Sequence, residues 1–133
     1  MISIALATYN GSKFLREQLD SILAQSMENF EVVACDDCST DETRQILEEY
    51  ASKDSRFKVF LNKNNLGFKK NFEHILSLCK GDFIAFCDQD DIWESNHLEI
   101  LYKNIGNNDC IGANSLIIDE NGIPQNKTLL EYW

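Results

Sequence analysis

Short apolar runs alternate with amphipathic stretches along the first hundred residues, and this alternation constrains the fold more than any other feature. The runs are mainly apolar at consecutive positions, which is typical of strands covered on both faces of a sheet. The stretches between them carry apolar residues at helical spacing, as at Leu15, Leu19 and Ile22. The predicted strands are residues 2–7, 30–35, 57–61 and 83–87. Strand–helix alternation predicts an α/β three-layer sandwich with a mostly parallel sheet and right-handed crossovers.

Four helices are predicted between and after these strands. Ser39 with Glu42 three residues later fits a capping box, so we expect the second helix to begin there. Gly81 follows the third helix and is expected to stop it. A fourth helix is expected from about Ser95. A fifth strand is expected at residues 110–119, followed by a turn at 120–124.

Length, composition and charge narrow the class of protein. A chain of 133 residues with 44% hydrophobic residues predicts one domain with a packed core. The formal net charge of −10 argues against a nucleic-acid-binding surface and gives no attraction to anionic lipid. No apolar run approaches the roughly 18 residues of a membrane-spanning helix. The N-terminus lacks the basic start and cleavage site of a signal peptide, so a cytoplasmic location is expected.

The five cysteines do not suggest a disulfide framework. Their number is odd, and a reduced setting is expected. Cys35 and Cys38 have the spacing of a zinc or redox pair, but no second such pair completes a four-cysteine site. We therefore expect these cysteines to serve mainly as small buried hydrophobic residues. His74 and His97 are expected to be structural or solvent-facing, with a supporting role beside the acidic cluster left open for His97.

Polar side chains follow three of the four predicted strands. Parallel strands in an open α/β sheet bind ligands outside their carboxyl ends, so these residues are expected at one edge of the sheet. Each of the three sets also has a simpler explanation. The residues after the first strand would form only a turn into a helix, the acids after the second strand would only complement the positive end of the next helix, and the acidic cluster after the fourth strand would be solvated surface. The residues are Thr8, Tyr9, Asn10 and Gly11; Asp36 and Asp37; and Asp88, Gln89, Asp90 and Asp91.

The acidic cluster after the fourth strand predicts a metal site. Like charges so close together raise each other's pKa unless a positive charge lies among them. Asp88 and Asp90, two residues apart beyond a strand, can converge on one hard divalent cation such as Mg²⁺ or Mn²⁺. Such a cation is often completed by substrate phosphates. The Tyr9 ring offers a surface for a base, and an aspartate after the second strand can accept a hydrogen bond from one.

Four stretches taken together resemble a known family. They are "SIALATYNGSKFLREQLDSILAQS", "FEVVACDDCSTDET", "NLGFKKNF" and "KGDFIAFCDQDDIW". In this order and spacing they resemble the inverting family 2 glycosyltransferases, which have the Rossmann-like GT-A fold. The likeness runs from about Ile2 to Leu101, with a weaker continuation to about Asp119. The "DQDDIW" form is most similar to bacterial enzymes of cell-surface polysaccharide assembly, including rhamnosyltransferases.

The resemblance implies a role for each matching residue. The donor would be a UDP- or dTDP-linked sugar, and the acceptor a glycan or a lipid-linked sugar. Ala7, Thr8 and Tyr9 match the segment that lines the nucleoside, and Asp37 matches the aspartate that pairs with a pyrimidine base. The last aspartate of the family's DxD motif binds the metal on the diphosphate. The motif falls on Asp88, Gln89 and Asp90, while Asp36, Lys70 and Asp91 are further candidate contacts.

One segment of the family pattern has no counterpart in this sequence. The catalytic base of the family is an acidic residue in the second half of the domain, and Asp119 and Glu120 come too early to match it. We therefore expect residues 1–133 to be the donor-binding part of a truncated domain, without its acceptor-binding half and with the base beyond Trp133. In a full-length protein, a peripheral position at the inner face of the plasma membrane is expected.

Two alternatives stay open on the sequence alone. A phospho-acceptor receiver domain is also α/β and of this length, although the ends of strands one and three, "TYN" and "NKNN", lack the acids that it needs. A non-catalytic nucleotide-binding module is the other. The sequence does not distinguish among sugars, acceptors or oligomeric states.

Overall fold

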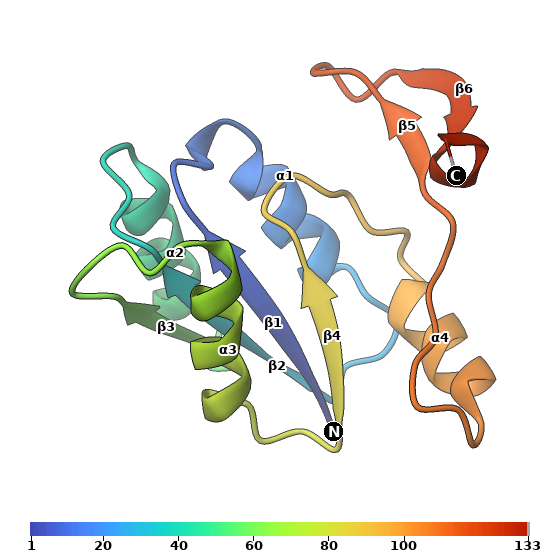
Figure 1. Cartoon of the computed structure of the whole chain (residues 1–133), viewed down its shortest axis with the longest axis horizontal. Helices are drawn as coiled ribbons and strands as arrows, with labels where there is room; N and C mark the ends of the chain where they lie inside the picture. The colour runs from blue at the N-terminus through green and yellow to red at the C-terminus, as the bar shows by residue number, and fades with distance from the viewer. Residues whose placement is uncertain (133) are drawn as a thin grey trace. The chain divides into compact units, whose positions relative to one another are not determined.

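The computed structural model describes residues 1–132 and divides into two compact units, Met1–Glu99 and Ile100–Trp133. The first unit contains the predicted alternation of strands and helices (Figure 1). Its elements are β1 (Ile2–Thr8), α1 (Ser12–Leu23), β2 (Phe30–Asp36), α2 (Thr43–Lys53), β3 (Phe57–Leu61), α3 (Phe68–Leu78), β4 (Phe83–Cys87) and the start of α4 (His97–Ile105).

The four strands form one parallel sheet in the order β3-β2-β1-β4. The chain runs outward from β1 to β3 and then returns to place β4 on the other side of β1. The crevice between β1 and β4 is therefore the topological switch point, where open α/β sheets bind their ligands. A receiver-type sheet has the order 2-1-3-4-5, so the topology argues against the receiver alternative.

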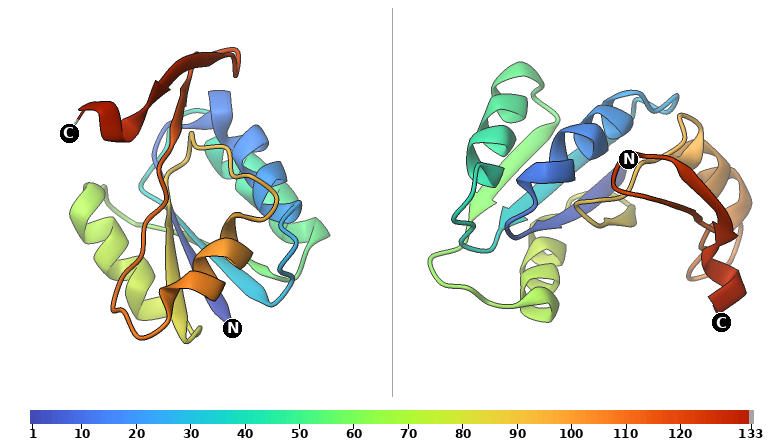
Figure 2. Two further views of the ribbon diagram at one scale, coloured as in Figure 1. Left: turned by 90° about the vertical axis from the view of Figure 1, so that its right-hand side faces the viewer. Right: turned by 90° about the horizontal axis from the view of Figure 1, so that it is seen from above.

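Helices cover both faces of the sheet, as predicted. Figure 2 shows α1 and α2 on one face and α3 on the other. Ile4 and Leu6 of β1 are fully buried in the larger core cluster, with α1 and α2, while Ala5 belongs to a smaller cluster with Ile75 of α3. Strand β1 is thus buried on both faces. Each large aliphatic side chain buried in this way stabilises the fold by roughly 1.5–3 kcal/mol.

Strand β4 differs from the prediction that all four strands are deeply buried. It pairs only with β1 among the described strands and forms an edge of the sheet. Phe86 is 62% exposed, and Cys87 is the only residue of β4 that is fully buried. A run without polar residues predicts burial but does not reveal which strand occupies an edge, because that depends on topology.

The second unit corrects the predicted fifth strand. Its strand β5 is only Leu116–Ile118, and it pairs with β6 (Pro124–Thr128) in a separate antiparallel sheet rather than joining the main one. The turn between them is the predicted one. The carboxylate of Asp119 accepts hydrogen bonds from the backbone N–H groups of Asn121 and Ile123. A short 3-10 helix, η1 (Leu129–Tyr132), follows.

Candidate functional site

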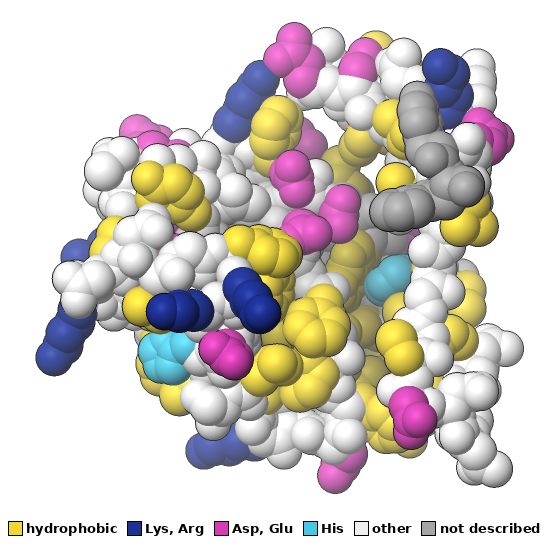
Figure 3. Space-filling view, in the orientation of Figure 1, with side chains coloured by type: hydrophobic (Ala, Val, Ile, Leu, Met, Phe, Trp, Pro, Cys, Tyr) yellow, Lys and Arg dark blue, Asp and Glu magenta, His cyan; other side chains and the backbone are white. Residues whose placement is uncertain are grey.

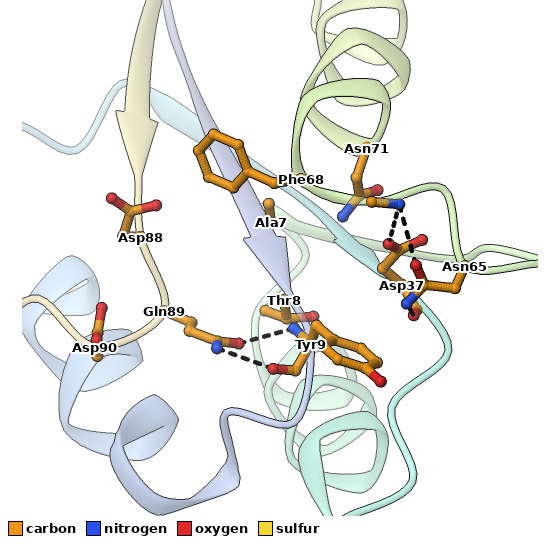
Figure 4. A pocket seen from close by; sticks show the side chains of 11 residues that line it. Ala7, Thr8, Tyr9, Asp37, Asn65, Phe68, Asn71, Asp88, Gln89 and Asp90 are labelled. Atoms are coloured by element: carbon orange, nitrogen blue, oxygen red, sulfur yellow. Dashed lines mark hydrogen bonds between the residues drawn. The ribbon is translucent and has the colours of Figure 1, made fainter.

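A pocket lies at the switch point of the main sheet, and the ends of β1, β2 and β4 contribute to it (Figure 4). Its volume of about 430 Å³ falls within the roughly 300–1,000 Å³ typical of small-molecule sites. All of its residues belong to the first unit. They are Ala7, Thr8, Tyr9, Asp37, Asn65, Gly67, Phe68, Asn71, Asp88, Gln89 and Asp90.

The loop after β1 is held in place by hydrogen bonds to the loop before α2 and to the first residue of that helix. Asn10 has a positive φ of 49°, a conformation that asparagine tolerates, and its side-chain oxygen accepts the N–H of Thr40 at 2.8 Å. The backbone N–H of the following residue, Gly11, donates a hydrogen bond to Thr43 Oγ1 at 2.9 Å. Tyr9 is left 50% exposed and lines the pocket. The segment therefore forms a turn into α1, which was the simpler of the two interpretations of its sequence, and its residue Tyr9 also lines the pocket.

Asp37 organises the opposite wall. Its Oδ1 accepts hydrogen bonds from Asn62 Nδ2 at 2.9 Å and from the N–H of Leu66 at 2.7 Å, and its Oδ2 accepts the N–H of Gly67 at 2.8 Å. Gly67 is the N-cap residue of α3, so Asp37 serves that helix and not the next helix in sequence, α2. A carboxylate offers about four lone-pair positions, and three are used. One lone-pair position, on Oδ2, has no hydrogen bond from the described residues.

Asp36 is directed elsewhere. Its carboxylate accepts hydrogen bonds from Thr8 Oγ1 at 3.1 Å, from the N–H of Ser39 at 2.9 Å and from the Ser39 hydroxyl. It is buried and does not line the pocket. Asp36 is the last residue of β2 and Asp37 the first beyond it, and only Asp37 lines the pocket.

The predicted metal ligands Asp88 and Asp90 both line the pocket, whereas Asp91 does not. Partial burial, followed by the neighbouring charge of Asp90, raises the pKa of Asp88. Partial burial and the charges of Asp88 and Asp90 raise the pKa of Asp91 in the same way. The repulsion expected from the sequence is therefore present in the structure, but burial contributes more to both shifts.

Ser21 of α1 and Gln25, two residues beyond the end of that helix, fix the segment that follows the acidic cluster. Ser21 Oγ accepts the N–H of Trp93 at 3.1 Å. Gln25 donates from Nε2 to the carbonyl of Glu94 at 2.8 Å and accepts the N–H of Leu98 at 3.0 Å. Both side chains are buried, so these bonds are shielded from water. The rigid helix thus anchors one end of the acidic loop.

Four pocket residues were not predicted as site residues: Asn65, Gly67, Phe68 and Asn71. They come from the loop before α3 and from its first turn. The Asn65 side chain donates to the carbonyl of Asp37 at 3.0 Å, and the Asn71 side chain donates to the carbonyl of Cys35 at 3.1 Å. The polar, glycine-containing stretch "NKNNLGFK" was a usable signal, because such loops at the edge of a sheet often carry function.

Phe68 is 73% exposed at the rim of the pocket and begins a row of aromatic rings. Its ring packs edge-on against Phe72 with centroids 4.9 Å apart, and Phe72 packs against Phe86 at 5.6 Å. Figure 3 shows hydrophobic side chains gathered over α3 and β4. The pocket is therefore apolar along one side and acidic along another.

Lys70 does not line the pocket and is exposed on α3. It precedes Asn71, which is buried and faces inward. Adjacent helical residues point about 100° apart, so the inward position of Asn71 directs Lys70 toward solvent. Its predicted contact with a phosphate or base stays a prediction that this conformation does not favour.

The donor set of the pocket fits a divalent cation that shares its ligands with a substrate. Its titratable lining residues are Tyr9 and three aspartates, and no lysine, arginine or histidine of the described chain belongs to it. Within residues 1–132 the structure shows no group of three or more His, Cys, Asp or Glu side chains converging on one point. Two carboxylates are too few for a metal site in which every ligand comes from the protein. They suit Mg²⁺, which usually keeps water and substrate phosphates as its other ligands.

The other candidate residues have structural surroundings. Cys35 is buried, and the thiol of Cys38 donates a hydrogen bond to the carbonyl of Asn62. Neither cysteine forms a disulfide. His74 Nδ1 lies 3.1 Å from the side-chain oxygen of Asn62. The ring of His97 lies 4.6 Å from that of Trp93, and burial lowers the pKa of the histidine.

Comparisons with known proteins agree with this architecture. EpsE, a putative glycosyltransferase of Bacillus subtilis, is 36% identical over 126 residues, covering 92% of this chain and 45% of EpsE. WfgD of Escherichia coli, a UDP-Glc:alpha-D-GlcNAc-diphosphoundecaprenol beta-1,3-glucosyltransferase, is also 36% identical, covering 88% of this chain and 49% of WfgD. The chain thus spans about half the length of these relatives.

Solved structures show the same fold. The UDP-GlcNAc complex of residues 1–349 of Staphylococcus aureus TarS matches with a TM-score of 0.73 and 36% identity, covering 78% of this chain and 30% of that one. A Pyrobaculum calidifontis mannosyltransferase, solved with GDP-Man and Mn²⁺, has the same TM-score at 22% identity over 89% of this chain and 35% of its own. The fold is therefore the GT-A-like sandwich expected from the motifs.

The family model described as glycosyl transferase family 2 matches residues 3–131, almost the whole of the sequence. Together with the switch-point pocket and the acidic loop beside it, this match shows that the chain belongs to glycosyl transferase family 2.

Proposed function

We propose that this chain is the donor-binding part of a metal-dependent glycosyltransferase that uses a UDP- or dTDP-linked sugar. The observation that carries the proposal is the charge of the pocket. Asp37, Asp88 and Asp90 line it, and no lysine or arginine within residues 1–132 does. A diphosphate entering such a pocket is repelled unless a cation accompanies it. The S. aureus TarS structures with UDP and UDP-GlcNAc support the choice of donor class.

The nucleoside would occupy the end of the pocket formed by Tyr9 and Asp37. The exposed face of the Tyr9 ring offers a stacking surface, and the free acceptor position on Asp37 Oδ2 suits the ring N–H of a pyrimidine. Phe68 at the rim adds a second aromatic surface. An aspartate that is already an acceptor for two backbone N–H groups is rigid, which favours recognition of one base geometry.

Asp88 and Asp90 would hold Mn²⁺ or Mg²⁺ at the other end. When bound, the cation would neutralise the diphosphate and stabilise charge on the leaving group as a Lewis acid. The chain itself brings two carboxylates to one wall and keeps competing cationic side chains of the described residues away from it. The charge of Asp90 adds to partial burial in raising the pKa of Asp88, and a cation between the two carboxylates would relieve their repulsion.

The sugar would be transferred with inversion to a glycan or lipid-linked acceptor. Inversion in one step requires a general base on the acceptor hydroxyl, and we propose that this base lies in sequence beyond Trp133. The lengths of EpsE and WfgD, about twice the span matched here, support that placement. WfgD by its name uses a diphosphoundecaprenol-linked acceptor, which supports a lipid-linked acceptor and a peripheral location at the membrane. No helix within residues 1–132 is long and apolar enough to cross a bilayer.

Calorimetric titration tests the proposal. UDP and dTDP are titrated into the chain with Mn²⁺, with Mg²⁺ and with EDTA. We expect binding that weakens at least about tenfold when the metal is removed, and the same loss in Asp90→Asn. Glu73→Gln, which removes an equal charge from an exposed position on α3, is the control. Folded protein that binds neither nucleotide in a metal-dependent way would contradict the proposal.

The donor-only part of the proposal has its own test. The 133-residue chain is incubated with radiolabelled UDP-glucose, UDP-GlcNAc or dTDP-rhamnose and Mn²⁺, with and without a lipid-linked acceptor. We expect retention of the donor without release or transfer of the sugar, because we propose that the base lies beyond Trp133. Steady transfer by this chain would show that the base lies within it.

A further inference from the structure

Gln89 stands between the two proposed metal ligands, and its side-chain amide is bonded to the backbone of Tyr9. Its Nε2 donates to the carbonyl of Tyr9 at 3.0 Å, and its Oε1 accepts the N–H of the same residue at 2.9 Å (Figure 4). One side-chain amide thus satisfies both backbone groups of Tyr9. The two loops that carry Tyr9 and the acidic cluster are 80 positions apart in sequence and are joined directly by this pair of bonds.

The pair continues the sheet beyond its last backbone pairing. Strands β1 and β4 pair in register from Ile2 with Phe83 to Leu6 with Cys87, where the described pairing ends. Two residues past the end of β4, the Gln89 amide takes the place that a neighbouring strand would take beside Tyr9. An amide is the only side-chain type that supplies both the donor and the acceptor with this shape.

Gly11 is fitted to the same amide. A Cβ built on Gly11 would overlap the Oε1 and Cδ atoms of Gln89 and lie 3.0 Å from its Cγ. The backbone of Gly11 has φ −106° and ψ 11°, which any residue can adopt. The nearest obstacle to a larger residue at position 11 is therefore the Gln89 side chain and not the backbone.

We propose that Gln89 is a positioning residue that couples the nucleoside-binding loop at Tyr9 to the acidic loop at Asp88 and Asp90, so that nucleotide and metal bind cooperatively. This inference rests on the proposed function. If Tyr9 shifts when a base packs on it, the two bonds transmit the shift to the acidic loop, and metal binding in turn orders Tyr9. Coupling of this kind is reciprocal between the two ligands.

The first test needs no metal or nucleotide. Hydrogen exchange of the Tyr9 backbone amide is followed by NMR in the wild type, Gln89→Ala and Gly11→Ala. We expect exchange at least about tenfold faster in both variants, because each removes the acceptor Oε1 from the Tyr9 N–H. Cooperative unfolding by urea checks that each variant is folded. Gln89→Glu keeps the acceptor and loses the donor, so it provides a second probe if the alanine variant does not fold.

The second test measures the coupling itself. The factor by which Mn²⁺ tightens UDP binding is determined by calorimetry for the wild type, both single variants and the double variant. We expect the factor to fall about tenfold in Gln89→Ala and in Gly11→Ala. The double variant should lose no more than Gln89→Ala alone, because the added methyl of residue 11 then has no amide to displace.

The outcomes separate this inference from the proposed function. If the wild type shows no metal-dependent UDP binding, the proposed function itself is contradicted. A wild type that couples the two ligands, together with a Gln89→Ala variant that couples them equally well, would overturn only the positioning role. Losses that simply add in the double variant would also overturn it, since they would show that Gly11 and Gln89 act independently.

Discussion

At the scale of single residues, the sequence predicted which residues line the pocket better than it predicted the direction of each side chain. Thr8, Tyr9, Asp37, Asp88 and Asp90 were predicted from their place after strands, and they line one pocket. Residue type and spacing sufficed there because parallel strands end at a common edge. Their roles toward a nucleotide and a metal stay predictions.

Other residue-scale predictions depended on rotation about a strand or helix, which the motifs do not determine. Asp36 lies beside Asp37 but its carboxylate holds Ser39, and Lys70 lies beside Asn71 but is exposed. The stretch "NKNNLGFK" indicates a functional loop, but it does not show which of its residues, such as Asn65, line the pocket. The place of Asn65 depends on a hydrogen bond to the carbonyl of Asp37, 28 positions earlier in the chain.

Substitution of Asp37 tests the double role of that residue. Asp37→Asn keeps the shape but replaces one acceptor oxygen with an NH₂ group that faces N–H donors from Leu66, Gly67 or Asn62. We expect a loss of about 1–3 kcal/mol in the free energy of unfolding, along with weaker UDP binding. Urea denaturation at pH 7 measures the first effect, with Glu73→Gln as the control. Stability within about 0.5 kcal/mol of the wild type would show that Asp37 does not organise the loop.

At the scale of elements, strands and helices were predicted well and helix starts less well. The expected capping box at Ser39 and Glu42 was wrong: α2 begins at Thr43, and Ser39 bonds to Asp36 instead. The carboxylate of Asp41 does the capping, accepting the N–H of Thr43 at 2.9 Å and the N–H of Ser12, at the start of α1, at 3.0 Å. A local motif cannot predict that one side chain serves two helices, because the second is distant in sequence.

The Asp41 caps predict a loss of stability in acid. Partial burial alone would raise the pKa of Asp41, but hydrogen bonds from Thr43 and Ser12 outweigh it and lower the pKa to about 2. Because the folded pKa lies below the unfolded value of about 3.9, the contribution is complete above that value and is lost as the pH falls toward 2. We expect it to amount to about 1–2 kcal/mol at pH 7.

The measurement compares urea denaturation of the wild type and Asp41→Ala at pH 7 and at pH 2.5. The variant should be less stable at pH 7, and most of the difference should vanish at pH 2.5. A difference that is equal at both pH values would show that the charge of Asp41 does not contribute to the caps.

Gly81 illustrates a second correction at this scale. It was expected to stop α3, but the helix ends at Leu78 with Cys79 as its C-cap. Gly81 is needed for the close approach of the chain to β1: an added Cβ would lie 2.5 Å from the backbone nitrogen of Ser3 and 2.8 Å from the carbonyl oxygen of Met1. The backbone atoms of β1 leave no room for a side chain at this position.

We expect Gly81→Ala to lower the free energy of unfolding by about 1–3 kcal/mol, because backbone must move to relieve the overlap. Gly112→Ala is the matched control, since an added Cβ there meets nothing within 4 Å. Thermal or urea denaturation of the two variants distinguishes them. Equal stability of both would show that β1 shifts at no cost.

At the scale of the whole molecule, the strand order was the decisive feature that the sequence left open. Alternation predicted a parallel sheet, but only the structure places β4 beside β1, at the edge, and so creates the switch point where the pocket lies. The predicted strand at 110–119 failed for a related reason. Only Leu116–Ile118 forms β5, and it pairs with β6 within the second unit. An apolar run indicates that a segment tends to form a strand, but it does not indicate with which strand that segment pairs.

The two ends of the pocket are expected to differ in what they require: one binds a nucleoside by itself, and the other binds phosphate only through a divalent cation. Uridine, UMP and UDP are titrated into the chain by calorimetry, each with Mn²⁺ and with EDTA. We expect uridine to bind in both conditions, with a gain from Mn²⁺ no larger than the coupling through Gln89, and the advantage given by Mn²⁺ to grow from UMP to UDP, where it exceeds that for uridine by at least about tenfold. Equal affinity for UDP with Mn²⁺ and with EDTA, in folded protein, would contradict this division of the pocket.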